Sequence, residues 1–117
     1  MIVGIGIDLI ELKRIEAAFA RQPRFPGRVL TSYEQDQMAQ LAPNRQIEYL
    51  AGRFAAKEAF AKAKGTGIGA GLSWHDIEIR TEGSGKPYIV VNDDSDRVHL
   101  SITHSKEYAA AQVVIET

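Results

Sequence analysis

A long helical segment that carries an acid on its apolar side constrains this chain most. Residues 45–64 repeat apolar side chains at helical spacing from Ile47 onward, namely at Leu50, Ala51, Phe54 and Ala55. Glu58 follows Ile47 by eleven positions. At about 100° per residue it returns almost to the line of Ile47 and Phe54. The segment therefore predicts a helix with a carboxylate in the middle of its buried face.

A buried carboxylate needs a partner, because burying a lone charge costs several kcal/mol or forces the group to become neutral. Lys62 lies one helical turn after Glu58, on the same side. One interpretation is a Glu58–Lys62 ion pair shielded by alanines. The other is a metal or substrate site at the point where this helix meets a sheet.

The first ten residues predict a buried strand. Val3, Ile5, Ile7 and Leu9 alternate with Gly4, Gly6, Asp8 and Ile10, so the two sets face opposite sides. Glycines on one side let a helix approach closely. Asp8 lies on this glycine side, at the carboxyl end of the strand. It either caps the helix that follows or forms a ligand site with Glu58.

Composition excludes several classes of protein. A chain of 117 residues fits one domain, residues 1–117, and 44% hydrophobic residues with a net charge of −1 fit a soluble globular protein. Zero cysteines exclude a disulfide scaffold and are compatible with a cytoplasmic location. The longest apolar run is too short to span a membrane. A nearly neutral charge balance also argues against nucleic acid as the partner.

Basic residues gather between residues 11 and 28. A helix over 12–20 would bury Leu12, Ile15 and Phe19 and present Arg14 and Arg21 on the opposite side. This side is either a solvated basic surface or a docking surface for an acidic helix. Prolines and a glycine at 23–27 predict a loop that carries Phe25 among arginines. The aromatic ring is either an exposed anchor or a plug over the core.

The remaining elements follow from local signals. Thr31 and Glu34 have capping-box spacing and open a short helix ending near Leu41, while Asn44 can cap the long helix and Gly65 can end it. Strands are predicted at 77–81, 87–91, 97–103 and 109–115. The glycine-rich loop at 65–69 is only a weak phosphate signal, because it follows a helix and lacks the Walker lysine. His104, at a strand end, either acts on a ligand or is structural.

Four motifs, in order along the chain, resemble the holo-acyl-carrier-protein synthases, the short bacterial type of 4′-phosphopantetheinyl transferase. They are GIGIDLIEL at the N-terminus, FAAKEAFAKAKGTGIG in the middle, GKP after the first hairpin strand and LSITHSKEYAAA near the end. The resemblance covers essentially the whole chain. It implies an α+β fold of the 4′-phosphopantetheinyl transferase type, with a small antiparallel sheet packed against a long central helix and shorter helices.

The resemblance also implies an activity. Family members move the 4′-phosphopantetheine arm of coenzyme A onto a serine of apo acyl carrier protein in fatty acid biosynthesis, with Mg²⁺ and release of adenosine 3′,5′-bisphosphate. Asp8 and Glu58 would bind the metal, and water would fill the position that Ile10 cannot. Glu58, Lys62 and His104 would be catalytic. Either Glu58 or a metal-bound water would take the serine proton.

Further residues are assigned by the same resemblance. The coenzyme site would comprise Lys62, Lys64, Gly65, Thr66, Gly67, Gly85, Lys86, Pro87, His104 and Ser105. The acyl carrier protein would dock on Arg14, Arg21, Arg24, Phe25 and Arg28. The family's short members are homotrimers with active sites at subunit contacts. The alternatives are a non-catalytic module that binds acidic helices and a transferase that serves polyketide or peptide synthase carriers.

Overall fold

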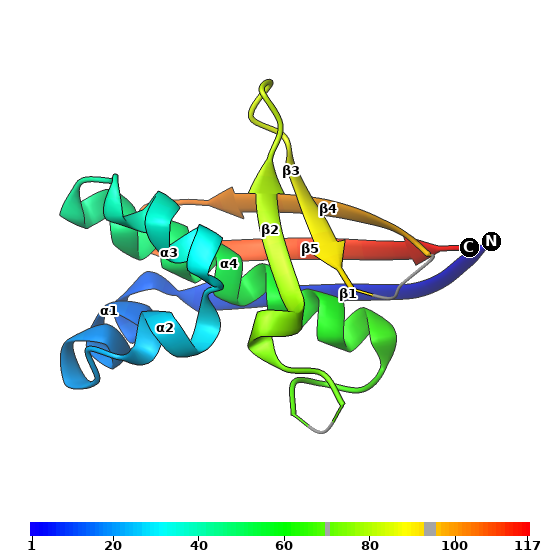
Figure 1. Ribbon diagram of the computed structural model, residues 1–117, viewed down its shortest axis with the longest axis horizontal. Coiled ribbons are helices and arrows are strands. Elements are labelled where there is room, and N and C mark those ends of the chain that lie inside the picture. The colour runs from blue at the N-terminus through cyan, green and yellow to red at the C-terminus, as the bar shows by residue number, and fades with distance from the viewer. Residues whose placement is uncertain (70, 93–95) are drawn as a thin grey trace.

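The computed structural model describes residues 1–69, 71–92 and 96–117 (Figure 1). In chain order the elements are β1 (Ile2–Glu11), α1 (Leu12–Arg21), α2 (Phe25–Val29), α3 (Ser32–Ala39), α4 (Pro43–Lys64), the 3₁₀ turn η1 (Trp74–Asp76), β2 (Ile77–Thr81), β3 (Pro87–Val91), β4 (Arg97–His104) and β5 (Tyr108–Glu116). The predicted order of helices and strands is thus confirmed, with α2 as an addition.

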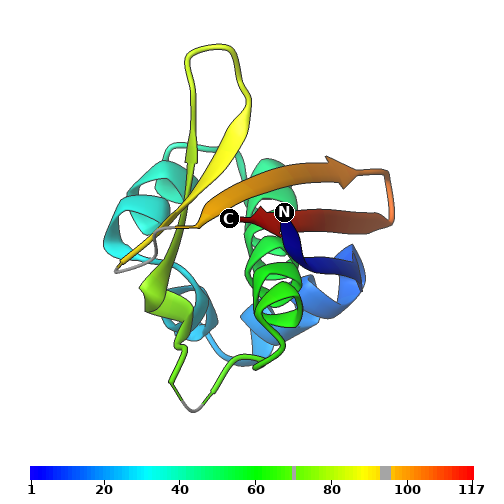
Figure 2. The ribbon, with the colours of Figure 1, turned by 90° about the vertical axis from the view of Figure 1, so that its right-hand side faces the viewer.

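Two antiparallel sheets and one long helix make up the framework. The larger sheet has the order β1-β5-β4, and β2 pairs with β3 in a separate hairpin. Helix α4 packs on β1 and β5, and the β2–β3 hairpin crosses over it (Figure 1). The chain ends lie side by side, where the Thr117 N–H donates to the Met1 carbonyl over 3.0 Å (Figure 2). The expected α+β architecture is confirmed.

Helix α4 is buried over more of its circumference than a simple stripe predicts. Its buried residues are Leu50, Ala51, Gly52, Ala55, Ala56, Lys57, Ala59, Phe60 and Ala61. The helix begins at Pro43 with Ala42 as N-cap, so the predicted cap at Asn44 was wrong. Proline suits a first helical position because its missing N–H has no partner there. Gly65 ends the helix with φ of 79°, as predicted.

The region before α4 is more helical than expected. Thr31 and Glu34 form the predicted capping box of α3. The predicted loop at 23–27, however, was partly wrong, because α2 begins at Phe25. Pro26 lies in the first turn of α2, where a proline does not disturb the helix.

Strand β1 is buried on one side only, which corrects the prediction of a buried strand. Val3, Ile5, Ile7 and Leu9 are between 51% and 65% exposed. Ile5, Ile7 and Leu9 pair with Val114, Gln112 and Ala110 of the neighbouring strand β5. The larger sheet therefore has an open apolar face opposite α4. Among the described residues, no helix has the length and apolarity needed to cross a bilayer.

Candidate functional site

Two glycines on β1 determine how closely α4 approaches the sheet. A side-chain carbon added at Gly6 would overlap the carbonyl oxygen of Ala59, and one at Gly4 would overlap that of Ala63. The predicted close approach of a helix to the glycine face is confirmed. Asp8 continues this face, so the same packing brings it to the C-terminal half of α4.

Asp8, Glu58 and Lys62 form one cluster there. The Lys62 ammonium donates to Asp8 Oδ1 and to the Ile7 carbonyl, both over 3.0 Å. The Asp8 side chain is only 16% exposed, whereas that of Lys62 is 53% exposed. Asp8 therefore does not cap α1, whose N-cap is Glu11. The Glu58–Lys62 pair is likewise not the ion pair observed, because Lys62 reaches Asp8 instead.

The surroundings of Glu58 favour the protonated form of its carboxyl. Burial raises the pKa of its carboxyl above the ordinary 4.5, the charge of Asp8 raises it further, and Lys62 only partly opposes both effects. Two carboxylates thus share one cation. No third acidic, histidine or cysteine side chain joins them within the described part of the chain. Two carboxylate ligands of this kind fit Mg²⁺, which prefers oxygen ligands and keeps several of its waters.

Within one chain, His104 lies away from Glu58 and Lys62. Its Nδ1 is 3.0 Å from Glu48 Oε2, near the start of α4. Glu48 precedes Glu58 by ten residues, which is about 15 Å along a helix. Within one chain, His104 and the carboxylate cluster therefore belong to separate sites.

The pocket beside His104 is basic. It has a volume of about 120 Å³ and is lined in part by Arg45, Glu48, Tyr49, Arg53 and His104. The Arg53 guanidinium lies over the Tyr49 ring at 3.8 Å, and the buried Nε of Arg53 has no hydrogen-bond partner among the described residues. An unpaired buried donor is costly. The pocket thus holds two guanidinium groups and one carboxylate, Glu48, which also lies 3.4 Å from Arg45 Nε.

Arg45 and Arg53 were not predicted as site residues from the sequence. A signal was present, because Arg53 interrupts an otherwise apolar stretch between Leu50 and Ala56. Burial raises the pKa of Tyr49 to about 12, so its hydroxyl stays protonated beneath the guanidinium.

The residues predicted to bind coenzyme A fall in three places rather than one. The glycine loop after α4 and the β2–β3 turn lie at opposite extremes of the molecule in both views, and the β4–β5 turn lies at a third (Figures 1 and 2). Gly65 and Gly67 in the loop, and Gly85 in the hairpin turn, have positive φ. Ser105 Oγ accepts the Tyr108 N–H over 3.2 Å, so it also shapes the β4–β5 turn. One chain alone does not unite these residues around a single ligand.

The arginines predicted to bind the carrier line two grooves. The first groove, of about 410 Å³, includes Arg14, Arg21 and Phe25 together with Ile10 and Phe54. It adjoins the carboxylate cluster, because Ile10 follows Asp8 by two residues and Phe54 precedes Glu58 by one turn. Phe25 stacks on Phe54 with centroids 6.2 Å apart and is half-buried, as a plug over the core would be.

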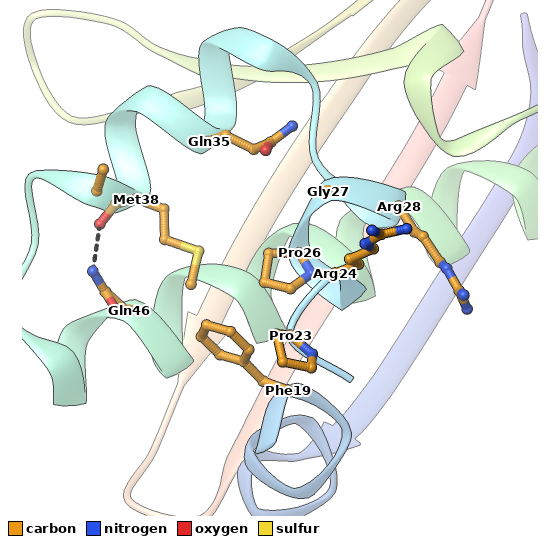
Figure 3. Close-up of a pocket in the computed structure, with 10 residues that line it drawn as sticks. Phe19, Pro23, Arg24, Pro26, Gly27, Arg28, Gln35, Met38 and Gln46 are labelled. Atoms are coloured by element: carbon orange, nitrogen blue, oxygen red, sulfur yellow. Dashed lines mark hydrogen bonds between the residues drawn. The ribbon is translucent and has the colours of Figure 1, made fainter. Parts of the chain in front are cut away.

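Arg24 and Arg28 line the second groove, of about 670 Å³ (Figure 3). Apolar side chains gather at its base, those of Phe19, Pro23, Pro26 and Met38. Arg28 Nη1 also donates to Gln22 Oε1 over 3.1 Å. The predicted arginines thus divide between two grooves, Arg14 and Arg21 in the first and Arg24 and Arg28 in the second.

Comparison with known proteins identifies the family. Residues 4–114 match the model of the 4′-phosphopantetheinyl transferase superfamily. The chain is 99% identical to a holo-[acyl-carrier-protein] synthase of Shouchella clausii, with both chains fully covered.

Solved structures show the same fold. A holo-(acyl-carrier-protein) synthase from Bacillus anthracis, in complex with CoA (3′,5′-ADP), superimposes with a TM-score of 0.94 at 52% identity and covers 100% of this chain and 98% of its own. The Helicobacter pylori holo-[acyl-carrier-protein] synthase in complex with coenzyme A gives 0.86 at 32% identity, with coverage of 96% and 99%. The chain therefore belongs to the 4′-phosphopantetheinyl transferase superfamily and, within it, to the holo-acyl-carrier-protein synthases.

Proposed function

We propose that this protein transfers the 4′-phosphopantetheine arm of coenzyme A to a serine of apo acyl carrier protein and releases adenosine 3′,5′-bisphosphate. Membership of the holo-acyl-carrier-protein synthases supports the reaction. The observation that carries it is the cluster of Asp8, Glu58 and Lys62 where β1 meets α4. Transfer to this carrier supplies fatty acid biosynthesis, which we place in the cytoplasm.

Asp8 and Glu58 would hold Mg²⁺. Burial raises the Glu58 pKa most and the neighbouring Asp8 charge raises it further, and a divalent cation between the two carboxylates would offset both effects. When bound, such a cation neutralises charge on a diphosphate and on its leaving oxygen.

The chain's own residues supply the remaining chemistry. Lys62 is half-exposed at the edge of the cluster, so its ammonium can turn from Asp8 toward a diphosphate oxygen. Glu58 is our candidate for the base that takes the serine proton, because Asp8, the other carboxylate of the cluster, is paired with Lys62. The loop residues Lys64, Gly65, Thr66 and Gly67 adjoin this end of α4.

The basic pocket at Arg45, Arg53 and His104 fits the 3′-phosphate of coenzyme A. A phosphate there would complement the guanidinium groups of Arg45 and Arg53 that line the pocket. The diphosphate and the 3′-phosphate belong to one small molecule, yet their proposed binding groups lie far apart within one chain. We therefore infer that two copies of the chain build each site.

The open apolar face of the larger sheet supports such an assembly. Ile5, Ile7 and Leu9 are each more than 60% exposed, and an apolar sheet face of this kind usually marks an interface. We propose a homotrimer in which this face is buried. The Gly85–Pro87 turn and Ser105 of one copy would then join the coenzyme site of another.

The carrier would dock in the groove of Arg14, Arg21 and Phe25. This groove adjoins the carboxylate cluster, so a serine on a docked acidic helix could reach the diphosphate. Arg24 and Arg28 would extend the positive field around it.

Mass spectrometry tests the proposal directly. Incubation of the protein with apo acyl carrier protein, coenzyme A and Mg²⁺ should add the mass of one phosphopantetheine arm to the carrier. A carrier whose acceptor serine is replaced by alanine is the control. No mass gain on the intact carrier would refute the proposed function.

A further inference from the structure

Lys57, the residue before Glu58, is a completely buried lysine whose ammonium is fully hydrogen-bonded. Its Nζ donates to the Val29 carbonyl over 2.7 Å, to Glu34 Oε1 over 2.7 Å and to the Trp74 carbonyl over 3.1 Å. An ammonium has three donors, and all three are used. Burying an ion pair is expensive even when the pair is well formed, so apolar residues of similar volume would often be equally stable. The pair therefore suggests a role other than stability.

Glu34 is also completely buried and extends the connection. It accepts the Thr31 N–H over 2.8 Å and the Ile79 N–H over 2.6 Å. Through these bonds the pair ties α4 to the end of α2, to α3, to η1 and to β2. Desolvation lowers the pKa of Lys57, and the Glu34 carboxylate opposes this effect.

The elements held by this pair carry the proposed binding surfaces. Strand β2 leads into the hairpin turn with Gly85, which we place in the coenzyme site. The Trp74 ring stacks on Phe54 with centroids 5.0 Å apart, and Phe54 lines the carrier groove. Glu58, the proposed metal ligand and base, is the next residue of α4.

We propose that Lys57, together with Glu34, is a positioning residue that fixes the coenzyme hairpin and the carrier groove relative to Glu58. The inference rests on the proposed function. Directed bonds to four elements fix both distance and orientation, whereas apolar contacts allow neighbouring elements to slide. A tetrahedral ammonium suits three acceptors that converge from different directions, which a planar guanidinium does not.

Steady-state kinetics with both substrates test this role. Lys57→Met removes the donors at similar length, and Glu34→Gln removes the charge while keeping the shape. We expect either change to raise KM for coenzyme A and for the carrier, with kcat/KM reduced by about tenfold to a hundredfold, as for residues that orient a reactive group. Ile115→Ala is the control, since Ile115 is equally buried on β5 but outside the network. It should lower the melting temperature without changing either KM.

Amide hydrogen exchange gives a readout that does not depend on turnover. Relative to Ile115→Ala, Lys57→Met should accelerate exchange selectively in β2, because the link between α4 and Ile79 is lost. If Lys57→Met does not fold, Glu34→Gln carries the test.

The outcomes separate the two proposals. A wild-type protein that transfers no phosphopantetheine refutes the proposed function. A wild-type protein that does, with variants that retain both KM values, overturns the positioning role. Failure of both variants to fold also overturns it, because the pair would then be purely structural.

Discussion

The Lys62 ammonium and the Asp8 carboxylate are in contact, with Nζ 3.0 Å from Oδ1. Asp8 is also one of the two proposed ligands of Mg²⁺, so lysine and metal act on the same carboxylate. Because like charges repel, the lysine should weaken metal binding until a diphosphate attracts it away.

This contact leads to opposite effects of Lys62→Met on binding and on turnover. Without coenzyme A, the variant should bind Mg²⁺ more tightly than wild type in calorimetry. With coenzyme A, kcat should fall by about a hundredfold or more, as when a donor that stabilises transition-state charge is removed. Lys13→Met, which removes an exposed lysine on α1, is the control. Weaker metal binding in Lys62→Met would contradict the competition.

The raised pKa of Glu58 predicts a dependence of stability on pH. The folded state binds the proton of the Glu58 carboxyl more tightly than the unfolded chain does. Ionisation of this carboxyl therefore lowers the stability as pH rises from the unfolded pKa near 4.5 to the raised pKa of the folded state. Above that window the cost is constant. In a chelating buffer, Glu58→Gln should therefore melt above wild type at neutral pH, and this gain should disappear on acidification below the window.

Addition of Mg²⁺ should reverse the order of the two melting temperatures, so that wild type melts above Glu58→Gln. At Mg²⁺ about 100-fold above its dissociation constant, a native-state ligand stabilises by about 2.7 kcal/mol. Wild type should gain this stability at neutral pH, and Glu58→Gln should gain much less. Equal thermal shifts in the two proteins would remove Glu58 from the metal site.

The central helix, the acidic residue Glu58 on its apolar side and the glycine face of β1 were predictable because local patterns encode them. Glycines at Gly4 and Gly6 mark a close helix approach, and Glu58 follows from helical periodicity. The end of α4 at Gly65 was predictable because glycine readily adopts the left-handed conformation that it has there. Each of these features is determined by the residues of a single segment.

The features that were missed depend on contacts between distant segments. Nothing near Lys57 in sequence indicates that Glu34 and two backbone carbonyls surround it. The complete burial of the Lys57 ammonium was therefore not predicted. The order of the motifs along the sequence also does not indicate that His104 and Glu58 lie apart within one chain. Alternation in β1 predicts two faces, but not that the side with Ile5 and Ile7 is exposed.

The groove of Arg14 and Arg21 predicts an electrostatic effect specific to the carrier. Arg14→Glu should raise KM for acyl carrier protein by about tenfold, since it replaces attraction to an acidic helix by repulsion. KM for coenzyme A should not change, and the defect should shrink as salt screens the charges. Lys13→Glu is a matched control, because it makes the same charge change one residue away on a different groove. Equal effects of the two variants would remove the docking role of Arg14.

The Arg53 guanidinium in the pocket beside His104 predicts discrimination at the 3′-phosphate. Arg53→Gln should raise KM for coenzyme A by about tenfold or more, the usual loss for a hydrogen bond to a charged group. With 3′-dephospho-coenzyme A, variant and wild type should have the same KM, because the phosphate is absent in both. Arg97→Gln, on the exposed pair with Glu116, controls for the loss of a positive charge. A defect of the same size with both substrates would place the 3′-phosphate elsewhere.

Division of the site between two copies predicts that defective chains can rescue each other. Glu58→Gln and Arg53→Gln should each be impaired at coenzyme A concentrations below the wild-type KM. Co-refolding equal amounts should restore activity, because an interface can combine an intact Glu58 from one chain with an intact Arg53 from its neighbour. Random assembly makes about a quarter of the interfaces intact. Adding Ile7→Glu to both chains should abolish the rescue, since a charge on the open apolar face blocks assembly. If both halves of the site lay within one chain, every site in the mixture would contain a lesion, and activity would stay at the mean of the two variants.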